Sequence, residues 1–194
     1  MRIVVIGATG TIGTALADAL AADHDVVRAS RRGAVRVDLA DPESIEALFT
    51  TVGNVDGVMA VAGSGRLAEL ADSSDDEYFV GLDSKYLGQI RLVRQAARRV
   101  NDGGFVTITS GFVPSTEPGL SFGAAVNTGL DGFVPAAALE MPRGIRVNSV
   151  SPGWISETLE SMGRDGATGT PVSEVVSAYL GLVYGTANGQ VIRP

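Results

Sequence analysis

The sequence predicts an α/β domain in which a mostly parallel sheet is covered by helices on both faces. Strand-like apolar runs alternate with helical segments along the whole chain. Near-continuous apolar strands separated by helices are typical of a parallel sheet that is buried on both sides. The 194 residues suffice for one domain with a sizeable core, and no linker, repeat or low-complexity tract divides them.

The individual elements follow from apolar runs and from the helical spacing of apolar residues. We expect strands at 3–6, 26–29, 35–37, 57–61, 105–109, 146–150 and 190–192, and helices at 12–22, 42–52, 75–100, 121–141 and 171–183. The helix at 75–100 has a strong start signal, because Ser74 is followed by acidic residues as far as Glu77 in the pattern of a capping box. The stretch 154–171 is rich in Gly, Ser and Thr, so it forms either a flap over a site or an ordinary surface loop.

Charge and composition narrow the functional class. The net charge is −7, so we do not expect the basic surface of a nucleic-acid-binding protein. The chain has no cysteine, which rules out disulfides and thiol catalysis and fits a reducing compartment. We see neither a membrane-spanning apolar run nor a signal peptide, and therefore expect a cytoplasmic protein. The single histidine, His24, lies in a polar turn where we expect it to be solvated, and we predict no metal site.

The clearest local motif is a glycine-rich turn between the first strand and the first helix. Three glycines at intervals of three residues follow the apolar run at 2–6 and open a segment with helical spacing. Glycine permits a tight turn and close approach of a ligand, and the helix N-terminus presents free N–H groups to a phosphate. The residues predicted to hold the pyrophosphate of a dinucleotide are Gly7, Thr9, Gly10, Thr11, Ile12 and Gly13.

Five marks spread over nearly the whole chain support this interpretation. They are Gly7-x-x-Gly10-x-x-Gly13, Val37-Asp38-Leu39, Ala62-Gly63, Ile108-Thr109-Ser110, and the run from Gly144 through Arg146-Val147-Asn148 to Pro152-Gly153. Together they resemble the short-chain dehydrogenase/reductase family, and the last of them looks like the family's sixth strand and its Pro-Gly turn. The resemblance implies a Rossmann-type, doubly wound sheet of seven strands in one domain over residues 1–194, which binds a nicotinamide dinucleotide.

The residues after the second strand indicate which nicotinamide cofactor to expect. An acidic residue there would bind a ribose hydroxyl, whereas this chain has Ser30, Arg31 and Arg32. Arginines suit a 2′-phosphate because they form charge-assisted, bidentate bonds, so we expect NADP(H); the alternative is a solvated basic turn. By resemblance Asp38 would face the adenine, although it could instead cap the turn before Pro42. The other cofactor positions that the resemblance implies are Leu39, Ala62, Gly63, Pro152, Gly153, Trp154 and Ile155.

The family's catalytic pattern is broken in this chain. The family uses an Asn, a Ser, a Tyr and a Lys, with the last two spaced Tyr-x-x-x-Lys on one helix. Alignment with the family puts Gly123 at the tyrosine position and Asn127 at the lysine position, and the expected helix around them contains neither Tyr nor Lys. Shifting the alignment by one residue supplies neither.

Three residues are candidates to replace the missing pair. Ser110 ends an apolar strand and matches the family's serine, although it could be a simple turn residue. Lys85, the chain's only lysine, falls where the family places its Asn, so Asn and Lys are exchanged between two neighbouring helices. Lys85 is expected on an apolar helix face, where it either delivers a proton or snorkels to water. Asn127 completes the exchange.

These observations favour an NADPH-dependent reductase of a small carbonyl, imine or activated alkene. Ser110 would bond the substrate, and Lys85 would supply the proton, directly or through water held by Asn127. The missing pair keeps two alternatives open: an NADP(H)-binding sensor or partner-binding module without redox activity, and a non-redox isomerase or cyclase. Trp154 would roof the nicotinamide or substrate, or pack in the core, and the loop 111–119 would line the crevice. The resemblance also implies a homodimer or homotetramer.

Overall fold

The computed structural model shows a sheet in which all neighbouring strands are parallel. The structure describes residues 1–63, 65–112 and 118–194. The strands are β1 (Arg2–Ile6), β2 (Asp25–Ser30), β3 (Val35–Arg36), β4 (Val55–Ala60), β5 (Val100–Thr109), β6 (Arg146–Val150) and β7 (Val191–Ile192). Their order across the seven-stranded sheet is β3-β2-β1-β4-β5-β6-β7. The predicted fold class is confirmed.

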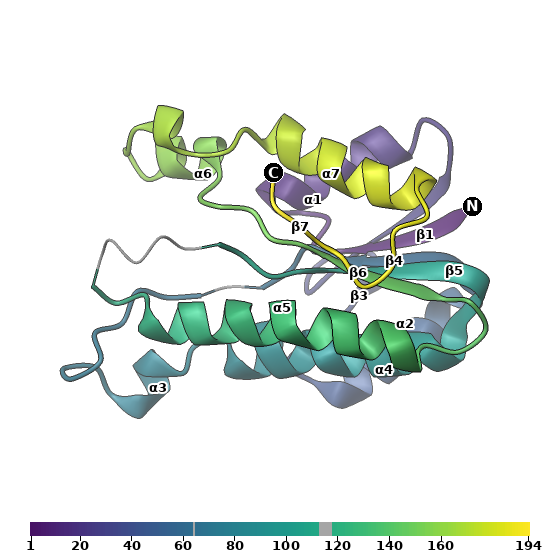
Figure 1. Ribbon diagram of the computed structural model, residues 1–194, viewed down its shortest axis with the longest axis horizontal. Coiled ribbons are helices and arrows are strands. Elements are labelled where there is room, and N and C mark those ends of the chain that lie inside the picture. Colours follow the sequence, from purple (N-terminus) through teal and green to yellow (C-terminus); the bar gives the residue numbers. More distant parts are fainter. Residues whose placement is uncertain (64, 113–117) are drawn as a thin grey trace.

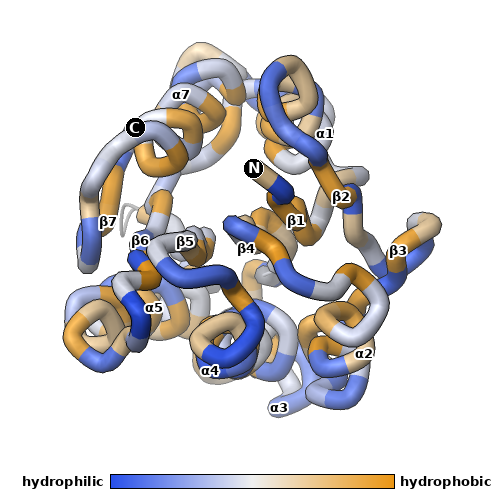
Figure 2. The backbone as a smooth tube through the Cα atoms, turned by 90° about the vertical axis from the view of Figure 1, so that its right-hand side faces the viewer, coloured by the Kyte–Doolittle hydropathy of each residue, from blue (hydrophilic) through white to orange (hydrophobic). Residues whose placement is uncertain are grey.

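Helices form a layer on each face of the sheet (Figure 1). One layer contains α1 (Thr11–Leu20) and α7 (Val172–Tyr184), and the other contains α2 (Pro42–Val52), α4 (Gly88–Arg99) and α5 (Ser121–Glu140). Each layer shares its own cluster of buried apolar side chains with the sheet. The end-on view in Figure 2 shows the apolar strands between the two layers, which explains why the strands are apolar along most of their length.

The sheet has a switch point between β1 and β4. From β1 the chain runs outward to β2 and β3 on one side, and then returns to place β4 on the other side. Ligands of open parallel sheets bind outside the carboxyl ends of the strands at such a point. Ile6 pairs with Ala60 at the ends of these two strands, and the Val61 N–H donates to the Ile6 carbonyl at 2.9 Å. The glycine-rich turn and the segment after β4 therefore start side by side.

The helix predicted at 75–100 is wrong in its first half. A short helix, α3 (Asp75–Tyr78), ends after one turn, and Gly81 follows with a φ of 100°. The chain then forms a π-helical segment, η1 (Leu82–Leu87), before α4 begins. The capping box at Ser74 is confirmed, but it starts only α3. Because a left-handed glycine and a π-helical turn interrupt the α-helical period, the spacing that placed one apolar face along the whole segment does not hold.

The stretch 154–171 is more ordered than a loop. It contains α6 (Ser156–Ser161) and a 3-10 turn, η2 (Gly166–Thr168). Its two ends are tied together, because the Thr170 N–H donates to the Trp154 carbonyl at 2.8 Å and the Ser156 N–H donates to the Thr170 carbonyl at 3.0 Å. The stretch is therefore a closed excursion of the chain with a fixed base.

His24 is not the solvated residue that the polar turn predicts. Its ring packs against Tyr184 with 5.6 Å between ring centroids. Both ring nitrogens are buried and have no hydrogen-bond partner within the described part of the chain. His24 directly precedes β2, so it lies at the amino-terminal edge of the sheet, at the opposite end from the switch-point ligand edge.

Candidate active site

The glycine-rich turn after β1 forms a cradle that needs glycine at two positions. Gly7 has a φ of 88°, and a Cβ on it would lie 2.8 Å from the backbone nitrogen of Ala62. A Cβ on Gly13 would lie only 2.0 Å from the Gly7 carbonyl oxygen. Gly10 is the N-cap of α1 and contributes no side-chain cap. The first N–H groups of α1 are therefore left for an anionic ligand.

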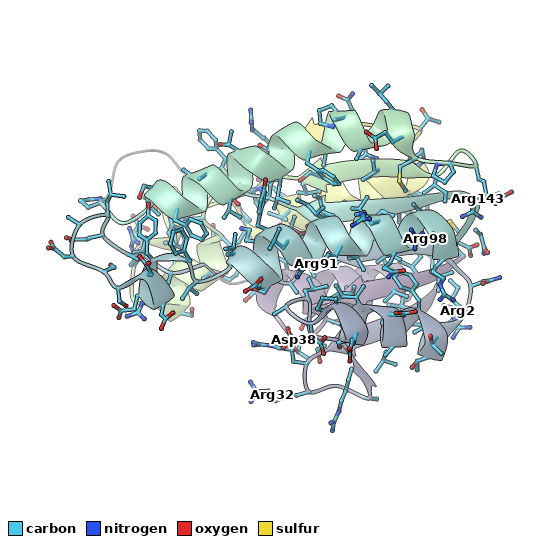
Figure 3. All side chains as sticks on the ribbon, turned by 90° about the horizontal axis from the view of Figure 1, so that it is seen from below. Arg2, Arg32, Asp38, Arg91, Arg98 and Arg143 are labelled. Carbon is cyan, nitrogen blue, oxygen red and sulfur yellow. The ribbon has the colours of Figure 1, made fainter. Side chains whose placement is uncertain are left out.

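A first cavity, of about 310 Å³, opens beside this turn. Arg31 and Arg32 line it, and both side chains are exposed and form no ion pair with any described residue. Figure 3 shows Arg32 extending outward near Asp38, which follows β3. Further predicted residues on its wall are Gly7, Thr9, Gly10, Ser30, Leu39, Ala62 and Gly63. Thr11 and Gly13 are not on this wall but belong to the helix start behind it.

Asp38 stabilises a turn and also faces the first cavity. Its carboxylate accepts a hydrogen bond from the Ala40 N–H at 3.0 Å, so it does stabilise the turn before α2. It also lines the first cavity. The N-cap of α2 itself is Asp41, whose carboxylate accepts from the Glu43 N–H at 2.9 Å.

A second cavity, of about 480 Å³, continues from the first. The two share Val61, Ala62 and Gly63 on their walls. The predicted residues that line it are Ile12, Lys85, Ser110, Asn127, Pro152, Gly153, Trp154 and Ile155. The three candidate catalytic residues thus come from three elements to one space. In the loop 111–119, the residues Gly111 and Phe112 also line it, while 113–117, including Pro114, lie outside the described residues.

Lys85 enters the second cavity from the π-helical segment η1. Its methylene chain packs against Gly63, where a Cβ would lie 3.0 Å from the Lys85 Cγ. Burial lowers the pKa of Lys85 from the usual 10.5 to about 8, and the Asp131 carboxylate acts in the opposite direction and raises it. The residue is half-buried and lines the cavity, so the long side chain is desolvated along the wall while part of it reaches water.

Gln89 fixes the segment that carries Lys85, and the sequence analysis missed it. This fully buried side chain donates to the Lys85 carbonyl at 2.9 Å and to the Thr109 carbonyl at 2.8 Å. It also accepts the Thr109 N–H at 2.8 Å. Gln89 therefore ties η1 to the end of β5, directly before Ser110.

Ser110 has a partner that the sequence analysis also missed. Its hydroxyl donates to the Asp131 carboxylate on α5 and lies 3.0 Å from the Ser149 hydroxyl. The same carboxylate accepts from Ser151 at 3.4 Å and pairs with Arg193 at 3.2 Å. Because the Ser110 proton points to Asp131, it is not available to a substrate oxygen in this arrangement. Asp131 lies one helical turn after Asn127, and that spacing was the available signal.

Asn127 presents an unused acceptor. The residue is 6% exposed, and its Oδ1 has no hydrogen-bond partner within the ranges that the structure describes. Its amide packs against Gly111, where a Cβ would lie 3.0 Å from the Asn127 Nδ2. Buried acceptors are nearly always satisfied in folded proteins, so this oxygen is available to a water or to a bound molecule.

None of the described residues that line the second cavity is a tyrosine. Tyr78 hydrogen-bonds Ser121 at 2.8 Å. Tyr179 is completely buried and bonded to Thr109, and burial raises its pKa. Tyr86 packs over Gly129. Trp154, by contrast, is on the cavity wall rather than in the core, with the Arg164 guanidinium 5.6 Å from its ring centroid.

Comparison with known proteins decides the family. The family described as enoyl-(acyl carrier protein) reductase matches residues 4–175. The chain belongs to the short-chain dehydrogenase/reductase family. Membership confirms the resemblance drawn from the sequence motifs and makes the chain an oxidoreductase of the short-chain dehydrogenase type.

Relatives and solved structures agree with this assignment. The 3-oxoacyl-[acyl-carrier-protein] reductase FabG of Escherichia coli K12 is 28% identical over 209 aligned residues, covering 95% of this chain and 85% of FabG. Protein lin1944 from Listeria innocua is 32% identical with a TM-score of 0.93, covering 100% of this chain and 98% of lin1944. A small-chain dehydrogenase solved in complex with NADPH is 25% identical with a TM-score of 0.87, covering 100% and 96%. Across the curated reductases that it matches, the chain spans 66–85% of the relative's length.

Two further features bear on the type of protein. No helix within the described ranges is long and apolar enough to cross a membrane. Within those same ranges, no group of three His, Cys, Asp or Glu side chains is placed to hold a metal ion.

Proposed function

We propose that the chain is an NADPH-dependent reductase that transfers hydride to a small carbonyl, imine or activated alkene. The continuity of the two cavities through Val61, Ala62 and Gly63 carries this proposal. The first cavity has a pair of arginines on its wall, and the second holds the chain's only lysine. One extended molecule could therefore place a phosphate at one end and a reacting group at the other. A relative named as a reductase and a structural neighbour in complex with NADPH support the proposal.

The residues of the first cavity fit NADPH. The glycine cradle and the open N-terminus of α1 suit a diphosphate. Arg31 and Arg32 suit a 2′-phosphate, and the buried Ser30 hydroxyl, which has no partner among the described residues, can bond the same group. When bound, NADPH supplies the hydride, while the protein orients the reactants and supplies the proton.

Lys85 is the proposed proton donor. With a pKa of about 8 it is mostly protonated near pH 7, yet it releases its proton more readily than an exposed lysine. Asp131 raises this pKa and so helps to keep the proton on Lys85 before the reaction. As hydride reaches the substrate carbon, the Lys85 ammonium would donate its proton to the substrate oxygen or nitrogen.

Ser110 and Asn127 take supporting roles in this proposal. Since the Ser110 hydroxyl donates to Asp131, we assign it to holding that carboxylate in place, and we assign the bond to the substrate oxygen to Lys85. The free Asn127 Oδ1 would accept a hydrogen bond from a ribose hydroxyl or from a water that relays the proton.

The altered catalytic pattern favours two alternative functions. Gly123 and Asn127 stand where the family has its Tyr and Lys. A protein that binds NADP(H) as a sensor or partner-binding module would not need a proton donor at all. A non-redox isomerase or cyclase would use Lys85 and Asp131 as acid and base without hydride transfer.

NADPH oxidation with a panel of neutral aldehydes, ketones and imines tests these proposals. In Lys85→Ala we expect kcat to fall about 100-fold or more, while NADPH binding changes by less than about threefold. Arg94→Ala, which removes an exposed cation of α4, is the matched control and should keep full activity. Unchanged kcat in Lys85→Ala would remove Lys85 from the mechanism. Tight NADPH binding without turnover would favour the sensor, and product formation without NADPH oxidation would favour the isomerase.

We also propose that the chain is cytoplasmic and assembles as a homodimer or homotetramer through α4 and α5. The exposed Gly132 of α5 leaves open space, since a Cβ on it would meet nothing within 4 Å. Leu139 on the same helix is 90% exposed. Sedimentation of the purified chain tests the assembly, and a monomer at micromolar concentration would contradict it.

A further inference from the structure

The wall of the second cavity is mostly apolar. Aromatic and aliphatic side chains come to it from α1, from the segments after β4, β5 and β6, and from α5. The larger ones are Ile12, Leu67, Val80, Phe112, Leu120, Phe122, Val126, Trp154 and Met162. Such a wall stabilises a ligand chiefly by burying apolar surface.

Two cations are among the described residues of this wall, and one of them forms an ion pair. Among the described residues that line the cavity, only Arg66 and Lys85 are charged. The Arg66 guanidinium lies 3.2 Å from the Glu77 carboxylate. The Asp131 carboxylate acts on Lys85 from α5. An anionic substrate would lose its hydration on this mostly apolar wall, and Lys85, which the proposed mechanism uses as proton donor, is the cation that would have to compensate for it.

The rim of the cavity carries negative charge. The chain leaves the wall at Leu67 and returns to it at Val80. Between these points it exposes four carboxylates, those of Glu69, Asp72, Asp75 and Asp76. Across the opening, the excursion with α6 exposes Glu160 and Asp165, together with Arg164, whose guanidinium lies 5.6 Å from the Trp154 ring centroid. Figure 1 shows α3 and α6 at the same end of the molecule, in opposite layers.

The helix α4 carries further cations, of which Arg91 is half-buried and Arg98 exposed. Arg91 and Arg98 follow one side of α4 toward Arg143 at the other end of the molecule (Figure 3). At the entrance the six exposed carboxylates outnumber Arg164, so the field there repels anions.

We propose that the substrate is a small, uncharged, apolar carbonyl compound that enters as a free molecule, and that the acidic rim discriminates against anions and against substrates tethered to an acidic carrier. This inference rests on the proposed reductase function. In the reaction the carbonyl carbon takes the hydride of NADPH and the carbonyl oxygen takes a proton, giving an alcohol and NADP⁺. The matched relative FabG is named for an acyl-carrier-protein substrate, so this chain would differ from it in substrate class.

Binding can be measured without any turnover, because Trp154 on the cavity wall is the chain's only tryptophan. Its fluorescence would be titrated with 2-acetylnaphthalene and with 6-acetyl-2-naphthoate, which differ by one carboxylate. At low salt we expect the neutral ketone to bind at least about tenfold more tightly. Added salt screens the rim carboxylates, so it should tighten binding of the naphthoate a few-fold and leave the affinity for the ketone unchanged. Equal or tighter binding of the carboxylate at low salt would overturn the proposal.

Reversing charges at the rim tests whether the electric field of its carboxylates, rather than the apolar wall, disfavours anions. Glu69→Lys/Asp72→Lys should tighten the carboxylate about three- to tenfold at low salt and leave the ketone unchanged. The control, Glu46→Lys/Glu140→Lys, reverses two exposed carboxylates on α2 and α5. Each double variant changes the net charge from −7 by the same amount. If both variants act equally, the rim has no special role and the proposal fails in that part.

Turnover separates failure of this inference from failure of the reductase function. We would compare kcat/KM for a 3-oxooctanoyl N-acetylcysteamine thioester, which is neutral, with that for the coenzyme A thioester of the same acyl group. At least about tenfold preference for the neutral thioester is expected. If both thioesters turn over equally, the substrate-class inference fails and the reductase function stands. If neither thioester supports NADPH oxidation while Trp154 fluorescence still shows tighter binding of the neutral ketone, the reductase function fails. The selectivity of the cavity then stands.

Discussion

The two ends of the cleft are built in different ways. The end that suits phosphates is made largely of backbone, with Gly7 and Gly13 leaving no room for a Cβ. The reacting end is made of side chains, chiefly Lys85, Asp131 and Asn127. A turn that needs glycine cannot accept a Cβ without a clash, so its sequence is constrained. Side-chain donors and acceptors, in contrast, can exchange places between neighbouring helices. Cofactor binding and chemistry can therefore diverge separately on this fold.

The largest effect is expected at the backbone end. Gly13→Val should cost about 3 kcal/mol of the free energy of unfolding and abolish NADPH binding, because the new Cβ would lie 2.0 Å from the Gly7 carbonyl oxygen. Gly181→Val on α7 is the matched control, since a Cβ on this exposed helical glycine would meet nothing within 4 Å. Denaturant unfolding and NADPH titration measure both. A stable Gly13→Val protein that still binds NADPH would contradict the account of this end.

A smaller effect is expected at the two arginines that line the first cavity. Arg31→Ala and Arg32→Ala should each lower the preference for NADPH over NADH by about tenfold or more, because each removes a charge-assisted partner of the 2′-phosphate. Arg36→Ala, an exposed cation of β3 outside the cavity wall, should leave the preference unchanged. Dissociation constants for both cofactors at two salt concentrations provide the measurement. Equal loss of NADPH and NADH affinity would show that the arginines do not read the 2′-phosphate.

The smallest effect is expected from a single charge at the reacting end. Asp131→Asn removes the carboxylate that raises the pKa of Lys85, so that pKa should drop below its value of about 8. Because Lys85 is the only lysine, one ¹³Cε resonance from labelled lysine reports it directly. Glu140→Gln, an exposed change on the same helix, should leave the resonance titration unchanged. An unaltered or higher pKa in Asp131→Asn would mean that the carboxylate does not act on Lys85.

The comparison also explains what the sequence could predict. The parallel sheet and the glycine turn rest on local patterns: apolar runs, and glycines at fixed spacing where the backbone needs them. The break at Gly81 was missed because a glycine inside a helical pattern is often tolerated. Its φ of 100° and the π-helical turn after it depend on how η1 packs against α4 and α5.

The reacting end was predicted only in part, for a similar reason. Lys85, Ser110 and Asn127 were found from their positions relative to the family's motifs, and all three line one cavity. Asp131 was missed because its partners come from the segments that directly follow β5, β6 and β7, which are far away in sequence. Gln89 was missed as a structural tie, although it lies one helical turn from Lys85.

The central claim is that Lys85 supplies the proton that the family takes from its tyrosine. The most direct test compares the pH dependence of single-turnover NADPH oxidation, with a neutral ketone as substrate, with the titration of the lysine resonance in the same protein. The account predicts that the rate falls with rising pH at the pKa of Lys85, about 8, and that both curves move to lower pH in Asp131→Asn. A rate that stays constant while Lys85 loses its proton would contradict it.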